Sequence, residues 1–142
     1  MQLMTKQSGF LLIEALVALL IFAFGILGLI ALQATVIKVT GEAKYRMEAV
    51  QFTNQLLGDM WADGQTLSTD KTAFQTAFSS PDGPRFQLWA AEVTNVGTGG
   101  LPGAATVLPT VVFGANNQVT ITVSWQQPGG ATHQHVTVTQ LQ

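Results

Sequence analysis

A single carboxylate, that of Glu14, lies within a long apolar run that extends from Phe10 to Leu32. A helix needs about 20 apolar residues to cross a bilayer, so this run is long enough to span a membrane. A carboxylate at the centre of a membrane helix costs about 2.5 to 3.5 kcal/mol. Because a simple membrane anchor has no use for such an acid, we expect Glu14 to have a function of its own.

Two histidines near the carboxyl end offer a second set of groups that could do chemistry. His133 and His135 alternate along the chain, so they share one face of a strand with Thr137 and Thr139. Two imidazoles can share a metal ion, but no cysteine or acid follows Glu92 to complete a ligand set. We therefore expect two solvated histidines, no metal site and no cofactor.

Two further pairs of polar residues lack the neighbours that catalysis requires. Asp59 and Asp63 lie about one helical turn apart, and a polar helix face explains them better than acid–base chemistry. Ser79 and Ser80 have no general base near them in the sequence. The glycine-rich segment 97–103 lacks the lysine and the strand–loop–helix context of a phosphate-binding loop. The sequence thus indicates no catalytic residues, and we expect a protein that is not an enzyme.

The elements that position these residues begin with one long helix. We expect it to start at Phe10, to cross the membrane as far as Leu32, and to end where Asp63 meets Gly64. Along its second half, one apolar stripe is predicted to face the rest of the protein, and three further residues widen this stripe. The stripe consists of Val36, Val39, Ala43, Met47, Val50, Leu57 and Trp61, and it is widened by Phe52, Leu56 and Met60.

Short helices and a small sheet are expected after this helix. Asp70 is placed to cap a short helix that ends at Phe78. Residues 85–97 are predicted to form another helix, with a strand as the alternative. Three segments are predicted strands of an antiparallel sheet, namely 106–113, 118–126 and 132–140. Pro109 would confine the first of them to an edge or a bulge.

The alternation of side chains predicts which face of the last two strands meets the core. In the clearest strand, the shared apolar face consists of Val119, Ile121, Val123 and Trp125. In the last strand, Val136 and Val138 are expected to face the core, while Thr120 and Thr137 point away from it. No Asp, Glu, Lys or Arg follows Glu92. This neutral surface fits either an exported domain that relies on Thr and Gln for solubility, or a surface that neighbours cover in an assembly.

Composition restricts the possible classes of protein. The chain has 142 residues, a net charge of −2 and no cysteine, so disulfides are excluded. After the apolar run, about 110 residues are left, which is enough for one small domain. The small negative charge, together with the lack of a Lys/Arg cluster, indicates no nucleic-acid partner.

The residues around Glu14 resemble the class III signal of type IV prepilins and pseudopilins. The matching segment reads Gly9-Phe10-Leu11-Leu12-Ile13-Glu14-Ala15-Leu16-Val17-Ala18-Leu19-Leu20, behind a short polar leader with Lys6. In that family a membrane aspartyl peptidase cuts after the glycine and methylates the new terminal amine. The resemblance implies that prepilin peptidase cleaves between Gly9 and Phe10 and that Phe10 becomes N-methylated. It also implies that Glu14 acts in assembly and fixes the register of neighbouring subunits.

Within this family, the run from Gly25 to Leu29, followed by Leu32 and Gln33, looks like that of PilV-type minor pilins, the type IV pilus modification proteins. This implies an α+β, type IV pilin-like fold, in which a long N-terminal helix packs on a small antiparallel β-sheet. The implied regions are a leader peptide (1–9), a transmembrane and filament-core helix (10–32), its amphipathic continuation (33–63) and a globular head (64–142). Major pilins differ in having a proline in the membrane helix and a disulfide-bounded loop.

The resemblance also implies a location and a set of partners. A count of Lys38, Lys44 and Arg46 against Lys6 would put the C-terminal domain in the cytoplasm. The resemblance implies the reverse, a single-pass inner-membrane protein with its C-terminal domain in the periplasm, found also at the pilus tip. Its implied role is to initiate pilus assembly, and its implied partners are prepilin peptidase, other minor pilins, the major pilin and a tip adhesin. A type II secretion pseudopilin is the alternative, and an anchored ligand-binding domain that is never processed is the third.

Overall fold

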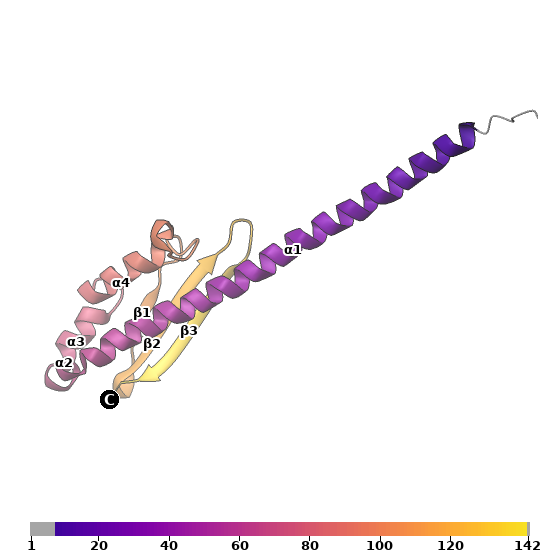
Figure 1. Cartoon of the computed structure of the whole chain (residues 1–142). Helices are drawn as coiled ribbons and strands as arrows, with labels where there is room; N and C mark the ends of the chain where they lie inside the picture. Colours follow the sequence, from indigo (N-terminus) through magenta and orange to yellow (C-terminus); the bar gives the residue numbers. More distant parts are fainter. Residues whose placement is uncertain (1–7, 142) are drawn as a thin grey trace, which may run out of the picture. The chain divides into compact units, whose positions relative to one another are not determined.

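The structure is a computed structural model that describes residues 8–141 of the chain (Figure 1). It consists of two compact units, one that ends at Gly41 and one that extends from Glu42 to the carboxyl end. We call the second unit the head. The long helix α1 (Ser8–Ala62) contributes residues to both units and begins two residues before the predicted start at Phe10. Of the predicted leader, residues 1–7 lie outside the described residues.

All other elements belong to the head. The α-helices after α1 are α2 (Gly64–Thr69), α3 (Lys71–Phe78) and α4 (Pro84–Thr94). Two single turns of 3-10 helix follow, η1 (Val96–Thr98) and η2 (Ala115–Asn117). The strands are β1 (Thr110–Phe113), β2 (Gln118–Gln126) and β3 (Thr132–Gln140).

The first unit is an exposed, apolar stretch of α1. Every residue from Gly9 to Thr40 is exposed, including large side chains such as Phe22 (66% exposed) and Leu27 (60% exposed). By length and composition, α1 is able to cross a membrane, and it is the one helix among residues 8–141 that meets this criterion. Exposing a surface of this kind to water is unfavourable in free energy, whereas covering it with lipid or with other apolar helices is favourable.

The head is an α+β fold of the type IV pilin-like kind, with a long N-terminal helix packed against a small antiparallel sheet (Figure 1). The strand order is β1-β2-β3, and both neighbouring pairs are antiparallel. The central strand β2 has the predicted bounds, and its predicted apolar face is buried, with Val119, Ile121 and Val123 all 0% exposed. This face, α3, α4 and the last turns of α1 enclose one hydrophobic core.

The prediction of the α1 face that packs on the core is half right: Leu56, Leu57 and Met60 are buried as predicted, but five of the predicted residues are exposed. The centre of the buried face is formed by Ala49, Thr53, Leu56 and Met60, each at most 1% exposed. The predicted stripe residues Met47 and Trp61 are 73% and 62% exposed, and Val36, Val39 and Ala43 are exposed too. Apolar residues lie on two sides of α1, and a hydropathy pattern does not single out a small alanine or a threonine as the centre of the buried face. In the structure the Thr53 hydroxyl donates to the Ala49 carbonyl at 2.9 Å, which satisfies it inside the core.

The prediction that Val136 and Val138 face the core is also wrong. They are 47% and 55% exposed, because they pair with Thr122 and Thr120 on the outer face of the sheet. Thr137 pairs with Ile121 and therefore lies on the core side, contrary to its predicted position. Both faces of β3 carry small or neutral residues, so a period of two residues cannot tell which face is buried.

The local predictions for the remaining elements agree with the structure, apart from the first strand. The Asp70 carboxylate accepts from the Ala73 backbone N–H at 2.9 Å and caps α3, which ends at Phe78 as predicted. Segment 85–97 is helical over most of its length, as α4. The first strand is shorter than predicted, because it begins at Thr110, directly after Pro109.

The buried face of α1 yields a test of this packing. Leu56→Ala should lower the free energy of unfolding of the head by about 2 to 5 kcal/mol, because Leu56 is 1% exposed. Met47→Ala, the matched control on the exposed side, should change it by less than about 0.5 kcal/mol. Denaturant unfolding of the full chain in detergent, followed by tryptophan fluorescence, measures both values. A larger loss for Met47→Ala would mean that the predicted stripe faces the sheet after all.

Candidate functional site

The candidate site at Glu14 lies on the apolar surface of the first unit. One helical turn before and after Glu14 stand Phe10 and Ala18, because residues four apart in a helix are neighbours on its surface. A shallow groove on α1 is lined by Glu14 and by five apolar residues, Phe10, Ile13, Val17, Ala18 and Ile21. The carboxylate is therefore the single ionisable group on an otherwise apolar strip of helix.

Glu14 has no ion-pair partner within residues 8–141. The ion pair that the structure describes for these residues joins Lys44 Nζ and Glu48 Oε1 at 3.6 Å, in the head. Lys6, on the predicted leader, lies outside the described residues. A group that compensates the Glu14 charge in an apolar medium must therefore come from beyond this part of the chain.

Gly9 is placed inside α1 with no packing reason to be glycine. A Cβ atom added at Gly9 would meet nothing within 4 Å, and the residue is exposed. Glycine inside a helix costs about 1 kcal/mol relative to alanine. Nothing within the described residues therefore requires a glycine at this position. The same open space surrounds Gly25 and Gly28, as expected of residues that permit close packing with other membrane helices.

The two histidines lie on the core side of β3 and are half-buried rather than fully solvated. The His133 ring stacks on Trp125, with ring centroids 5.8 Å apart and an angle of 22° between the rings. His135 Nε2 lies 2.9 Å from the Thr137 hydroxyl oxygen. Among the described residues, no group of three or more His, Cys, Asp or Glu side chains is placed to hold a metal ion.

The two acidic residues near the end of α1 have different surroundings. The Asp63 carboxylate accepts from the Thr66 hydroxyl at 3.0 Å, across the start of α2. Asp59 lines a hollow of the head surface, together with Arg85 and Glu92. Asp63 thus has a local structural partner, in agreement with its prediction as part of a helix end.

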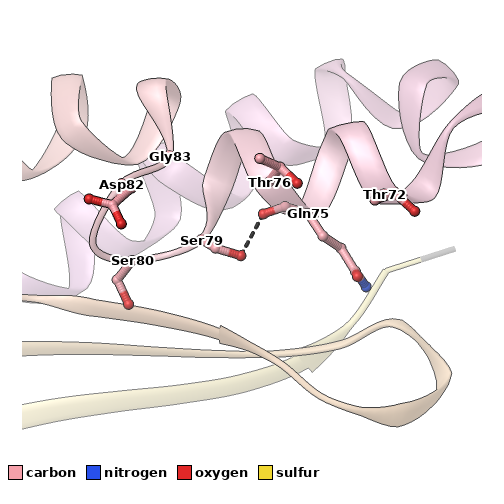
Figure 2. Close-up of a pocket in the computed structure, with 7 residues that line it drawn as sticks. All are labelled: Thr72, Gln75, Thr76, Ser79, Ser80, Asp82 and Gly83. Atoms are coloured by element: carbon pink, nitrogen blue, oxygen red, sulfur yellow. Dashed lines mark hydrogen bonds between the residues drawn. The ribbon is translucent and has the colours of Figure 1, made fainter.

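The serine pair lines a polar hollow at the end of α3 (Figure 2). The hollow is lined by Thr72, Gln75, Thr76, Ser79, Ser80, Asp82 and Gly83. The Ser79 hydroxyl donates to the Gln75 carbonyl at 2.5 Å, as the dashed line in Figure 2 marks. The Ser80 hydroxyl accepts from the Val111 N–H and donates to the Val111 carbonyl, both at 3.1 Å. Both hydroxyls are therefore used to fix the turn between α3 and α4.

The role of Ser80 escaped sequence reasoning because its partner Val111 lies on β1, far along the chain. No local pattern encodes such a pair. Gly83 is the second device in this turn, since a Cβ there would lie 2.5 Å from the Ala77 carbonyl oxygen and 2.7 Å from that of Ser79. Only glycine allows the start of α4 to approach the end of α3 this closely.

Comparison with family models, with curated protein sequences and with solved structures found no match.

The turn at Gly83 yields a prediction of stability. Gly83→Ala should destabilise the head by about 1 to 3 kcal/mol, because the added methyl group must displace backbone carbonyls. Gly58→Ala, on the exposed side of α1 with nothing within 4 Å of the new Cβ, should instead stabilise it by about 0.5 to 1 kcal/mol. Thermal unfolding of the full chain in detergent gives both shifts. Equal shifts of one sign would contradict the close approach at Gly83.

Proposed function

We propose that this protein is a minor pilin that prepilin peptidase processes and that takes part in initiating type IV pilus assembly. The observation that carries the proposal is Glu14, a carboxylate without a partner among residues 8–141 on an apolar helix surface. The junction of Gly9 and Phe10, four residues before it, supplies the signal. The α+β pilin-like fold of the head supports the same class of protein.

The chemistry of the proposal begins with a new terminal amine. Cleavage after Gly9 would leave the Phe10 amine one helical turn from Glu14, about 6 Å along the helix axis. In apolar surroundings, an ion pair between the amine and the carboxylate is much stronger than in water. The amine of one subunit would meet the carboxylate of its neighbour, and the pair would fix the register of the two helices.

The energetics of assembly follow from the exposed surface of α1. Lipid covers this surface before assembly, so its transfer into a bundle of similar helices is close to neutral in free energy. A near-neutral transfer makes entry into the filament reversible, and the ion pair then decides which register is stable. In this proposal the head lies in the periplasm and joins other minor pilins, the major pilin and a tip adhesin at the pilus tip.

A pseudopilin of type II secretion would share the signal, the acid and the helix. The run from Gly25 to Leu29 favours the pilus branch, as in the PilV-type minor pilins that it resembles. Neighbouring genes distinguish the two, since pilin genes accompany one and secretion genes the other. A never-processed anchor is distinguished by the state of its amino terminus.

The signal at Gly9 is tested by a bulkier residue. Gly9→Val should leave full-length precursor in the membrane, because the peptidase must approach the backbone at this residue. Gly25→Val is the matched control: it places the same side chain in the same helix, at a site equally free of contacts, and should be processed normally. Immunoblots of cells that carry the peptidase separate precursor from mature chain. Normal processing of Gly9→Val would refute this cleavage site.

The role of Glu14 is tested by removing its charge and keeping its shape. Glu14→Gln should insert into the membrane and be cleaved. Its incorporation into filaments should fall by about tenfold or more, since this requires a loss of only about 1.4 kcal/mol of association free energy. Glu48→Gln, which removes a carboxylate from the head part of the same helix, should assemble normally because surface ion pairs contribute little. Quantification in sheared filaments measures both, and full incorporation of Glu14→Gln would disprove the role in assembly.

A further inference from the structure

The sheet of the head has two edges, and the structure treats them differently. The strand order β1-β2-β3 leaves β1 and β3 each with one side that no strand covers. An uncovered strand side carries a row of backbone N–H and C=O groups that are able to pair with another chain. What occupies each edge therefore bears directly on which surfaces of the head can bind a partner.

The β1 edge is short and is closed by another part of the head. The Ser80 hydroxyl bonds to both the N–H and the C=O of Val111, and the Ser80 N–H also donates to the Val111 carbonyl at 3.1 Å. β1 extends only from Thr110 to Phe113, so this contact occupies its centre. Pro109, directly before the strand, donates no hydrogen bond. This edge offers little to a partner strand.

The β3 edge is long, regular and open. All nine residues from Thr132 to Gln140 pair with β2 in continuous register, with no bulge. The backbone hydrogen bonds that residues 8–141 provide to this strand all belong to its ladder with β2. β3 contains no lysine, other formal charge or proline, which are the residues that usually guard an exposed edge.

We propose that β3 binds an extended, uncharged strand of a partner protein, which adds to the sheet as a fourth strand. Main-chain hydrogen bonds would give the affinity, as in other cases of strand addition. The requirement for an uncharged strand follows from charge complementarity. β3 itself contains no Asp, Glu, Lys or Arg, so a charged side chain on the incoming strand would find no opposite charge directly across from it on β3.

The outer face of the sheet sets the side chains that such a strand would carry. There Val136 and Val138 are 47% and 55% exposed, beside half-buried Thr122 and Thr120. Small β-branched residues at alternate positions would continue this face, since cross-strand pairs of such residues stabilise a sheet. The partner segment is therefore expected to alternate valine-like and threonine-like residues over about the length of β3.

A second copy of this chain fits the β3 edge poorly. β3 runs in the same direction as the part of α1 that belongs to the head (Figure 1). Antiparallel pairing of two copies would reverse one head, so that its chain would enter at Glu42 from the opposite side. The β3 strand of a copy would also bring Gln134, Gln140 and two histidines, rather than small β-branched residues at alternate positions.

This inference needs only the head, so its test is independent of the proposed function in pili. The chain has no cysteine, so a single introduced thiol reports one position. We would compare Val136→Cys on β3 with Val112→Cys on β1, which lies on the same outer face and is 57% exposed. The probe is an acetylated, amidated nonapeptide of alternating threonine and valine with a central cysteine. A second version carries N-methyl groups on all of its backbone amides, so these amides cannot donate main-chain hydrogen bonds.

The measurement is the rate of disulfide formation between the peptide and the full chain in detergent, at a fixed concentration of oxidised glutathione, which takes up the two electrons and is reduced to glutathione. Val136→Cys should react about tenfold faster than Val112→Cys or more, because a docked peptide raises the effective concentration of its thiol. The N-methylated peptide should remove the difference. Unfolding midpoints equal to wild type confirm that each variant is folded, and Val138→Cys replaces Val136→Cys if it is not.

Three results would overturn the proposal. Equal rates at β1 and β3 would show that the β3 edge has no preference for a strand. An unchanged rate with the N-methylated peptide would show that main-chain hydrogen bonds are not involved. Disulfide formation between two copies of Val136→Cys that is faster than reaction with the peptide would identify a second copy as the occupant.

Discussion

The charge of Glu14 needs a partner that residues 8–141 do not supply, and this condition governs how the first unit can behave. The side chains that share its groove are apolar, so none of them donates a hydrogen bond to the carboxylate. In a membrane, such a group is costly unless it is paired, hydrated at the interface or neutralised. A cation from another molecule, or an amine created at Phe10, would lower that cost and bind α1 to a specific neighbour. A partner for the Glu14 carboxylate is therefore a group outside residues 8–141 and not a part of the fold of the first unit.

The head differs, because several of its polar groups near the core find their partners inside it, although Trp125 Nε1 and Gln127 Nε2 are buried without a hydrogen-bond partner among the described residues. Thr53 is satisfied within α1, Ser80 joins the turn before α4 to β1, and the Trp89 indole donates to the Phe52 carbonyl at 2.9 Å. The Trp89 contact ties α1 to α4, and the Ser80 contact ties the turn before α4 to the sheet. One continuous helix therefore supplies both an apolar surface for neighbours and one wall of a small domain with its own hydrophobic core.

The sequence was sufficient to predict elements that depend on neighbouring residues. The bounds of β2 and β3, the cap of α3 at Asp70 and the helical state of α4 all follow from local patterns. It was not sufficient where two faces of one element compete for the core. On α1, Thr53 and Ala49 lie at the centre of the contact, although their hydropathy is unremarkable beside that of Met47 and Trp61.

The same limit applies to β3 and to the sites. Register with β2 turns Val136 outward, and register is a property of two strands rather than of one. Ser80 bonds to Val111 across the fold, so only the structure reveals that one sheet edge is closed. For the candidate site, the resemblance to the class III prepilin signal implies Gly9, Phe10 and Glu14, and the apolar run independently singles out Glu14. The structure adds the apolar groove and the lack of a partner within residues 8–141. The roles of these three residues stay predictions.

The central claim is that this chain leaves the membrane as a processed subunit of a filament. The most direct measurement is the intact mass of the protein in filaments sheared from wild-type cells. The account predicts a chain that begins at Phe10 and carries one additional methyl group. Its detection only in the membrane fraction, with residues 1–9 still attached, would contradict the account.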